Sequence, residues 1–275
     1  KPLETEVPLW EFPRGPTPGL FLHRILELWD FTDPNEETLE DLIRKEGVRF
    51  QLWGAQEESP EWLSLLTESL LDIAQAPLLV ANSTSYRLAD ITRRARLDEL
   101  DFDFPIHPNG TSFSVNDLER IFAMHPNPNL PDDYPRCLRQ LSFAPLRGFM
   151  TGSIDLTLTH NQQFFLADYK SNHLGDFPSD YCQSNLIDAM SHHHYFLQYH
   201  IYTVALHRYL RWKLGNHYKT QADYEKYFGG VYYLFLRGMN SQSSNGIFFD
   251  KPPYELIEAL SEAFSGTPLL SKEAS

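Results

Sequence analysis

Residues 153–170 decide the fold that we expect for this chain, and they read SIDLTLTHNQQFFLADYK. In the first half, an apolar residue occupies every second position of 154–158, which is the pattern of a β-strand with one buried face. The second half opens with a continuous apolar run at 164–167, as in a strand that is buried on both faces. Asn161-Gln162 between the two halves is a plausible turn, so we predict a β-hairpin.

Apolar residues recur at helical spacing on both sides of this hairpin. Before it we predict helices at 19–29, 36–46, 60–75 and 114–122. After it we predict helices at 179–190 and 194–214, and a terminal helix that begins at residue 253 and ends near residue 264. We predict two more strands, at 97–104 and 231–236, and the first of them alternates apolar with acidic side chains.

This order of helices and strands predicts an α/β protein with a small mixed central sheet flanked by helices. We expect a Pro-rich, extended lead-in at 1–18 and a single domain at 19–275. Within that domain we expect a helical subregion at 19–96, an α/β core at 97–250, and a C-terminal helix and tail at 251–275.

The charge of the chain limits the functions that we consider. Its 275 residues include 23 Lys and Arg against 37 Asp and Glu, a formal net charge of −14. A general basic surface for nucleic acid is therefore excluded, because each phosphate contact needs a cationic side chain that displaces a counterion. Any contact with nucleic acid must be local, metal-assisted or helped by a partner.

The cysteines and the N-terminus bear on the cellular compartment. Two cysteines, Cys137 and Cys182, are too few for a disulfide framework or a four-thiolate iron–sulfur cluster. No apolar stretch approaches the ~18 residues of a membrane span, and the first residues lack the apolar segment of a secretory signal. The sequence starts without Met and contains no Gly-x-x-x-x-Gly-Lys-Ser/Thr loop. We expect a cytoplasmic piece of a larger polypeptide with no membrane partner.

Two carboxylates and a lysine are expected to converge on the hairpin. Asp155 lies on the first strand and Asp168 on the second, and Lys170 shares a strand face with Asp168 because side chains alternate with a period of two. Two carboxylates and a substrate phosphate suit Mg²⁺, and a neighbouring lysine can orient the attacking water and stabilise developing charge. Metal-dependent phosphodiester hydrolysis requires this set of groups. A structural ion pair between Asp168 and Lys170 is the alternative, because buried charges are costly unless paired.

A set of motifs runs in order along the chain. The hairpin region contains GFMTGSID (148–155) and LADYKSN (166–172), and LQYHIYTVALHRYL (197–210) contains a Gln-x-x-x-Tyr motif. The remaining motifs are FGGVYYLFLRG (228–238), FPRG (12–15) and GLFLH (19–23). Together they resemble the RecB-type nuclease family of the PD-(D/E)XK superfamily, from about residue 12 to about residue 250. The resemblance implies a restriction-endonuclease-like core.

The resemblance implies a role for each matching residue. His23, Asp155 and Asp168 would ligate a metal ion, with the backbone carbonyl of Tyr169 beside them. Lys170 would be the catalytic lysine, acting with the two aspartates.

Three more residues are candidates for the same site. Gln198 and Tyr202 stand four positions apart, hence on one helix face, and would shape the site or guide DNA. Glu99, on the acidic face of the earlier strand, is our candidate for the additional catalytic glutamate of the family.

The resemblance also implies the cofactor. We expect Mg²⁺; an imidazole ligand leaves room for Mn²⁺ as a substitute, and Ca²⁺ could occupy the site without turnover. We expect neither an iron–sulfur cluster nor a zinc site. The run His192-His193-His194 does not suggest zinc, because three consecutive residues cannot all face one point on a helix.

The function implied by the resemblance is a metal-dependent nuclease that hydrolyses mainly single-stranded DNA. It would be the nuclease part of a RecBCD-type helicase–nuclease in double-strand break repair and recombination. The implied partners are single-stranded DNA ends, the helicase portion of the same polypeptide, and RecC- and RecD-like subunits, with a RecA-like recombinase as a further candidate.

Two other functions compete with this one. The first is a catalytically quiet interaction module on the same fold, which docks a recombinase or a partner subunit. The second is a glycosidase that uses Asp155 and Asp168 as its acid/base pair, and Lys170 disfavours it because a cation would keep the acid ionised.

Overall fold

A computed structural model of the chain describes residues 5–53, 62–80, 85–107, 112–141, 146 and 148–266. The chain divides into two compact units that interleave along the sequence. Unit 1 consists of Lys1–Leu100, Asp155–Ala189 and Tyr232–Phe249, and unit 2 of Asp101–Ile154, Met190–Val231 and Asp250–Ser275. The predicted domain boundaries at residues 18, 96 and 250 stay predictions.

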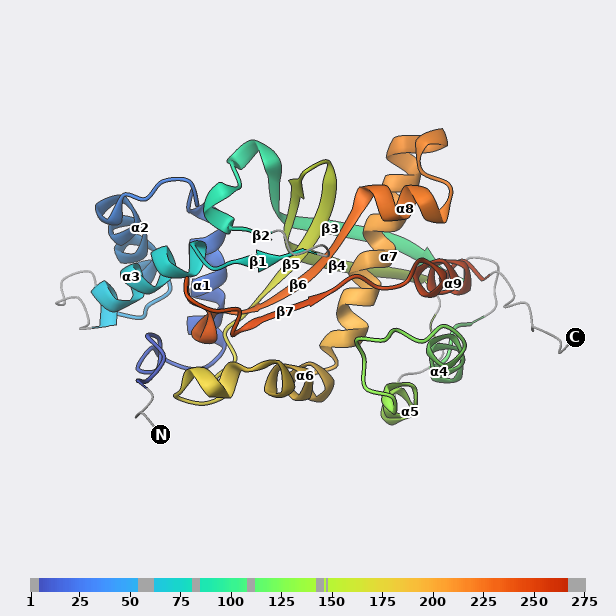
Figure 1. Ribbon diagram of the computed structural model, residues 1–275, viewed down its shortest axis with the longest axis horizontal. Helices are drawn as coiled ribbons and strands as arrows, with labels where there is room; N and C mark the ends of the chain where they lie inside the picture. Colours follow the sequence, from blue (N-terminus) through green and yellow to red (C-terminus); the bar gives the residue numbers. More distant parts are fainter. Residues whose placement is uncertain are drawn as a thin grey trace, which may run out of the picture. The chain divides into compact units, whose positions relative to one another are not determined.

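The sheet contains five strands in the order β3-β4-β5-β6-β7 (Figure 1). Their bounds are β3 Arg96–Ile106, β4 Gly148–His160, β5 Gln163–Lys170, β6 Phe228–Phe235 and β7 Ile247–Asp250. Helices precede the sheet in the sequence and join its strands, so the predicted mixed α/β class is confirmed.

The predicted hairpin is formed by β4 and β5. The two strands are antiparallel, with a register that runs from Leu156↔Ala167 to His160↔Gln163. The connecting residues Asn161 and Gln162 both have positive φ, 47° and 66°. Two such residues make the tight turn that matches the right-handed twist of hairpin strands, and asparagine tolerates this backbone region well.

Unit 1 contains the N-terminal helices α1 Pro16–Leu28, α2 Glu36–Arg49 and α3 Trp62–Ala74. Pro16 stands in the first turn of α1, where its missing N–H costs nothing. The helix thus begins inside the stretch 1–18 that was predicted to be an extended lead-in. Asn35 caps α2 by accepting a hydrogen bond from the backbone N–H of Thr38. Two strands of two residues each, β1 Leu78–Leu79 and β2 Ser85–Tyr86, form a separate small sheet that the sequence patterns did not predict.

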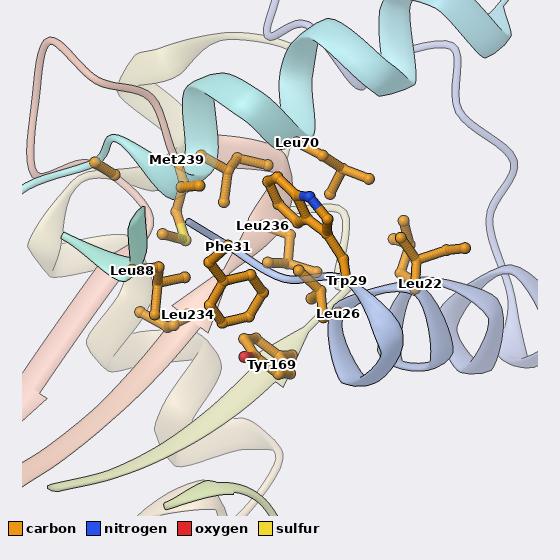
Figure 2. Packing of buried hydrophobic residues seen from close by; sticks show 14 of the residues in the cluster. Leu22, Leu26, Trp29, Phe31, Leu70, Leu88, Tyr169, Leu234, Leu236 and Met239 are labelled. Carbon is orange, nitrogen blue, oxygen red and sulfur yellow. The ribbon is translucent and has the colours of Figure 1, made fainter. Parts of the chain in front are cut away.

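The core of unit 1 fixes α1 against the sheet. Leu22, Leu26 and other apolar residues of α1 belong to one buried cluster with Tyr169 of β5 and Leu234 of β6. Figure 2 shows the ring of Tyr169 near Leu26, with Leu70 of α3 in the same cluster. Burying a leucine side chain contributes roughly 1.5–3 kcal/mol, so this cluster holds the helix firmly.

Unit 2 is built around the long helix α7 Tyr195–Leu214, which packs against α9 Tyr254–Phe264. α4 Val115–Met124 also packs on α9. Unit 2 also contains α5 Tyr134–Cys137 and α8 Gln221–Tyr227, whereas most of α6 Gln183–His192 belongs to unit 1. α4, α6, α7 and α9 lie close to the predicted positions, whereas α5, α8 and β7 were not predicted. Across the described residues, no helix combines the length and apolar character needed to cross a membrane.

Candidate metal centre

Both ends of α1 contact neighbouring elements, and His23 lies in the middle of this helix. Near the start, Gly19 approaches Ser171 so closely that a Cβ atom would lie 2.8 Å from the Ser171 Oγ atom. A larger residue at this position would have to displace the Ser171 hydroxyl. At the end of the helix, the side chain of Arg96 donates to the carbonyl of Trp29 (2.6 Å). Carbonyls in the last turn of a helix lack partners within it, so an arginine satisfies them well.

A second arginine strengthens this tie. Arg93 donates to the backbone carbonyls of Glu27 (2.8 Å) and Leu28. Arg96 is buried, lies over the ring of Phe31 (3.7 Å from its centroid) and pairs with a carboxylate at the start of β3. The helix that carries His23 is thus fastened to the strand that carries Glu99.

Glu99 departs from regular strand geometry. The burial of β3 alternates as predicted, and Glu99 is on its exposed, acidic face. Its φ is 51°, in the left-handed region that side chains other than glycine rarely adopt. Such a conformation costs of order 1–3 kcal/mol, and within a strand it sets Glu99 apart from its neighbours.

The resulting geometry suits one cation. His23, Glu99 and Asp155 each offer a ligand atom, and these three atoms all lie within 4.8 Å of one another. Opposite ligands of a bound ion are separated by about 4.2 Å for Mg²⁺ and about 5 Å for Ca²⁺, twice the usual metal–oxygen distances. The three side chains can therefore bind one divalent ion after small side-chain movements.

Asp155 and Asp168 occupy matching places on the two hairpin strands. Continuing the β4–β5 register by one position pairs Asp155 with Asp168, so both side chains point to the same sheet face. One carboxylate oxygen of Asp155 accepts a hydrogen bond from the backbone N–H of Tyr169 (2.8 Å) and lies 3.4 Å from Nδ1 of His23. These contacts fix the carboxylate of Asp155 beside the imidazole.

Lys170 and Asp168 form the buried ion pair that the sequence predicted as an alternative to a catalytic role. The Asp168 side chain is 4% exposed and that of Lys170 12%. The ammonium of Lys170 also lies 5.0 Å from the ring centroid of Tyr233 on β6. The lysine is thus held next to the carboxylates, a geometry that serves a structural and a catalytic role equally well.

The charges of the site perturb two pKa values. Burial, reinforced by the charge of Asp155, raises the pKa of Asp168 to about 7 even though Lys170 opposes the change. For His23, burial acts to lower the pKa, but the hydrogen bond and charge of Asp155 outweigh it and the pKa is raised. The negative charge of Asp155 contributes to both shifts, and a bound cation would offset it.

Two of the remaining candidates belong to unit 2. Gln198 donates a hydrogen bond to the hydroxyl of Tyr202 (2.8 Å), so the two residues share one face of α7 as predicted. Both belong to unit 2, whereas the carboxylates belong to unit 1, and their part in the site stays a prediction. The backbone carbonyl of Tyr169, in unit 1, also stays a predicted ligand. The run His192–His194 is exposed and covers the last residue of α6 and the two residues that precede α7.

Sequence reasoning missed Arg93 and Arg96. The only visible signal was a cluster of basic residues, Arg93-Arg94-Ala95-Arg96, immediately before an acidic strand. Nothing in such a cluster shows that its members bind a helix that ends about 65 residues earlier.

The fold and the site define a mixed α/β protein with a candidate centre for one divalent cation, formed by an imidazole and carboxylates beside a buried lysine. No protein-family model matches the chain. The chain is, however, similar to the RecBCD enzyme subunit RecB of several bacteria. The identity is 36% over 260 residues with the protein of Escherichia coli K12, 37% over 262 residues with that of Haemophilus influenzae Rd, and 34% over 278 residues with that of Mycobacterium tuberculosis H37Rv.

These matches cover 94%, 95% and 93% of this chain, and 20%, 19% and 24% of the respective RecB proteins. The chain belongs to the RecB family and spans about a fifth of the length of these relatives.

Proposed function

We propose that the chain is a metal-dependent DNA nuclease domain that hydrolyses phosphodiester bonds, mainly in single-stranded DNA. It would be the nuclease part of a RecBCD-type helicase–nuclease in double-strand break repair and recombination. The observation that carries the proposal is the grouping of His23, Glu99 and Asp155 next to the Asp168–Lys170 pair. Similarity to a subunit of the RecBCD enzyme supports it.

The donor set favours a hard divalent cation. His23, Glu99 and Asp155 would hold it, with Asp168 and the carbonyl of Tyr169 as further proposed ligands. Carboxylates favour Mg²⁺, and the single imidazole makes Mn²⁺ a suitable substitute. When bound, the cation would polarise the phosphoryl group and lower the pKa of a bound water.

The side chains have roles of their own in this proposal. Lys170 is held by Asp168 and by the ring of Tyr233, so its ammonium is oriented before the substrate arrives. It would stabilise the negative charge that grows on the phosphoryl oxygens and orient the attacking water. Gln198 and Tyr202 would guide the DNA strand.

A cleavage assay tests the proposal. The chain is incubated with a labelled single-stranded oligonucleotide and Mg²⁺ or Mn²⁺, with and without EDTA. We expect cation-dependent cleavage that Asp155→Asn and Lys170→Ala each lower by at least about a hundredfold, whereas Lys170→Ala retains cation binding. Asp103→Asn, which changes an exposed carboxylate on β3, is the matched control and should cleave like the parent chain.

The outcome separates the two main functions. A folded chain that binds cations but cleaves no strand with either metal would support the interaction module that docks a recombinase or partner subunit. Loss of cation affinity in Lys170→Ala would indicate that this lysine is a purely structural partner of Asp168.

The net charge of −14 predicts slow cleavage by the chain alone. A strongly acidic protein repels DNA, so strand delivery would depend on the helicase portion of the polypeptide and on RecC- and RecD-like subunits. We place the protein in the cytoplasm as part of the same proposal.

A further inference from the structure

The C-terminal half of α7 exposes two large aromatic side chains next to each other. Trp212 is 77% exposed and Tyr209 is 45% exposed. Their rings contact each other at a centroid distance of 6.0 Å and an interplanar angle of 47°. Isolated exposed apolar residues are common on proteins, but a contacting Tyr–Trp pair with its ring faces in water is a specific feature.

This pair continues the face of α7 that carries Gln198 and Tyr202. The positions 198, 202, 205, 209 and 212 are spaced by four, three, four and three residues, the spacing of a single helix face. Along this face Tyr202 is 9% and Ala205 8% exposed, and exposure then rises sharply at Tyr209. At 1.5 Å per residue, Trp212 lies ~15 Å along the helix from Tyr202.

The segment that carries the pair differs in charge from the chain as a whole. The segment 189–222 contains no aspartate or glutamate, although the chain has 37 of them. Lys213 is exposed at the end of the same helix. Arg208 donates to the carbonyl and hydroxyl of Ser261, which are neutral groups. Arg211 contributes less, because Glu258 on α9 pairs with it.

We propose that Tyr209 and Trp212 form a stacking platform for the bases of single-stranded DNA, with Lys213 placed to attract the backbone. Exposed aromatic faces beside cations are how proteins bind single strands without sequence preference. Duplex bases hide their faces, so the platform selects unpaired DNA. Trp and Tyr also dominate protein–protein contacts, but a segment without acidic residues in an acidic chain favours a polyanion. The choice of DNA rests on the proposed function; the platform itself needs no catalysis.

Binding measured in EDTA tests the platform separately from cleavage. The full chain is titrated with fluorescent oligothymidylate, and tryptophan fluorescence is recorded. We expect Trp212→Ala and Tyr209→Ala each to weaken binding about tenfold, within the range known for removed base–aromatic stacking. Trp212→Phe should retain most of the affinity while losing the fluorescence quenching. Trp10→Ala, which changes a 39%-exposed tryptophan of unit 1, should bind like the parent chain.

Several results would overturn the proposal. These are unchanged affinity in both alanine variants, no measurable binding by the parent chain, or equal affinity for a blunt duplex of the same length. Loss of binding to a purified RecC- or RecA-like protein in Trp212→Ala, with DNA affinity intact, would assign the pair to a protein interface instead. A failed cleavage assay leaves the binding result untouched.

Discussion

The buried carboxyl of Asp168 should make the cation-free protein less stable as the pH rises above 6. Its pKa is about 7 in the folded chain and 3.8 for an ordinary aspartate. Between these values the folded state holds a proton that the unfolded state has released. Stability falls with pH wherever the folded state binds more protons, so this contribution is complete below pH ~3.8 and is lost as the pH passes ~7.

The size of the effect follows from the two pKa values. One unit of pKa difference corresponds to ~1.4 kcal/mol, so a single group with a folded pKa of about 7 loses on the order of 1 kcal/mol between pH 6 and 8.5. Asp168 is 3% exposed, so solvent screening scarcely reduces this value. His23 acts in the same direction because its pKa is also raised.

Urea unfolding in EDTA, followed by circular dichroism at several pH values, measures this slope. In Asp168→Asn the residue cannot ionise, so the fall in unfolding free energy between pH 6 and 8.5 should be smaller by on the order of 1 kcal/mol than in the parent chain. Asp103→Asn, at an exposed position, should keep the parent slope. Parallel profiles for the parent and Asp168→Asn would refute the assignment of a raised pKa to Asp168.

Three further predictions concern the elements that build the site. Arg96→Met should lower the unfolding free energy by roughly 1–3 kcal/mol in urea titrations, because it leaves the carbonyl of Trp29 without this donor and leaves Arg93 as the remaining partner of Asp98; an unchanged unfolding free energy would contradict this. Leu26→Ala should lower the unfolding free energy by roughly 2–5 kcal/mol, whereas Leu20→Ala, at a 63%-exposed position on the same helix, should leave it nearly unchanged. Equal melting temperatures for these two variants would show that the buried face of α1 does not anchor the helix. Glu99→Gln should weaken Mn²⁺ binding in calorimetry by at least about tenfold, and unchanged affinity would remove this residue from the cation site.

Local periodicity was enough to predict much of the fold. The hairpin of β4 and β5 and the long helix α7 occur where they were predicted, although β4 begins earlier, at Gly148. By contrast, β7 has four residues and α8 has seven, too few for a periodic pattern to emerge. A strand as short as β7 is defined by its partner β6, which local sequence does not show.

The site was predictable to the extent that it depends on strand alternation. A period of two places Asp168 and Lys170 together, and the hairpin register brings Asp155 to the same face. The meeting of His23 with Glu99 follows instead from tertiary contacts and from a left-handed backbone at Glu99, neither of which has a local sequence signal.

The three candidate ligands come from positions 23, 99 and 155, so the centre exists only when distant parts of the chain have come together. An unfolded chain would offer the ion isolated carboxylates and an isolated imidazole, which bind it weakly. Any affinity of the centre is therefore added to the free energy of folding: an ion present at a hundred times its dissociation constant contributes ~2.7 kcal/mol. Removing the ion with a chelator would then lower the stability of unit 1 as well as stop the proposed cleavage of DNA.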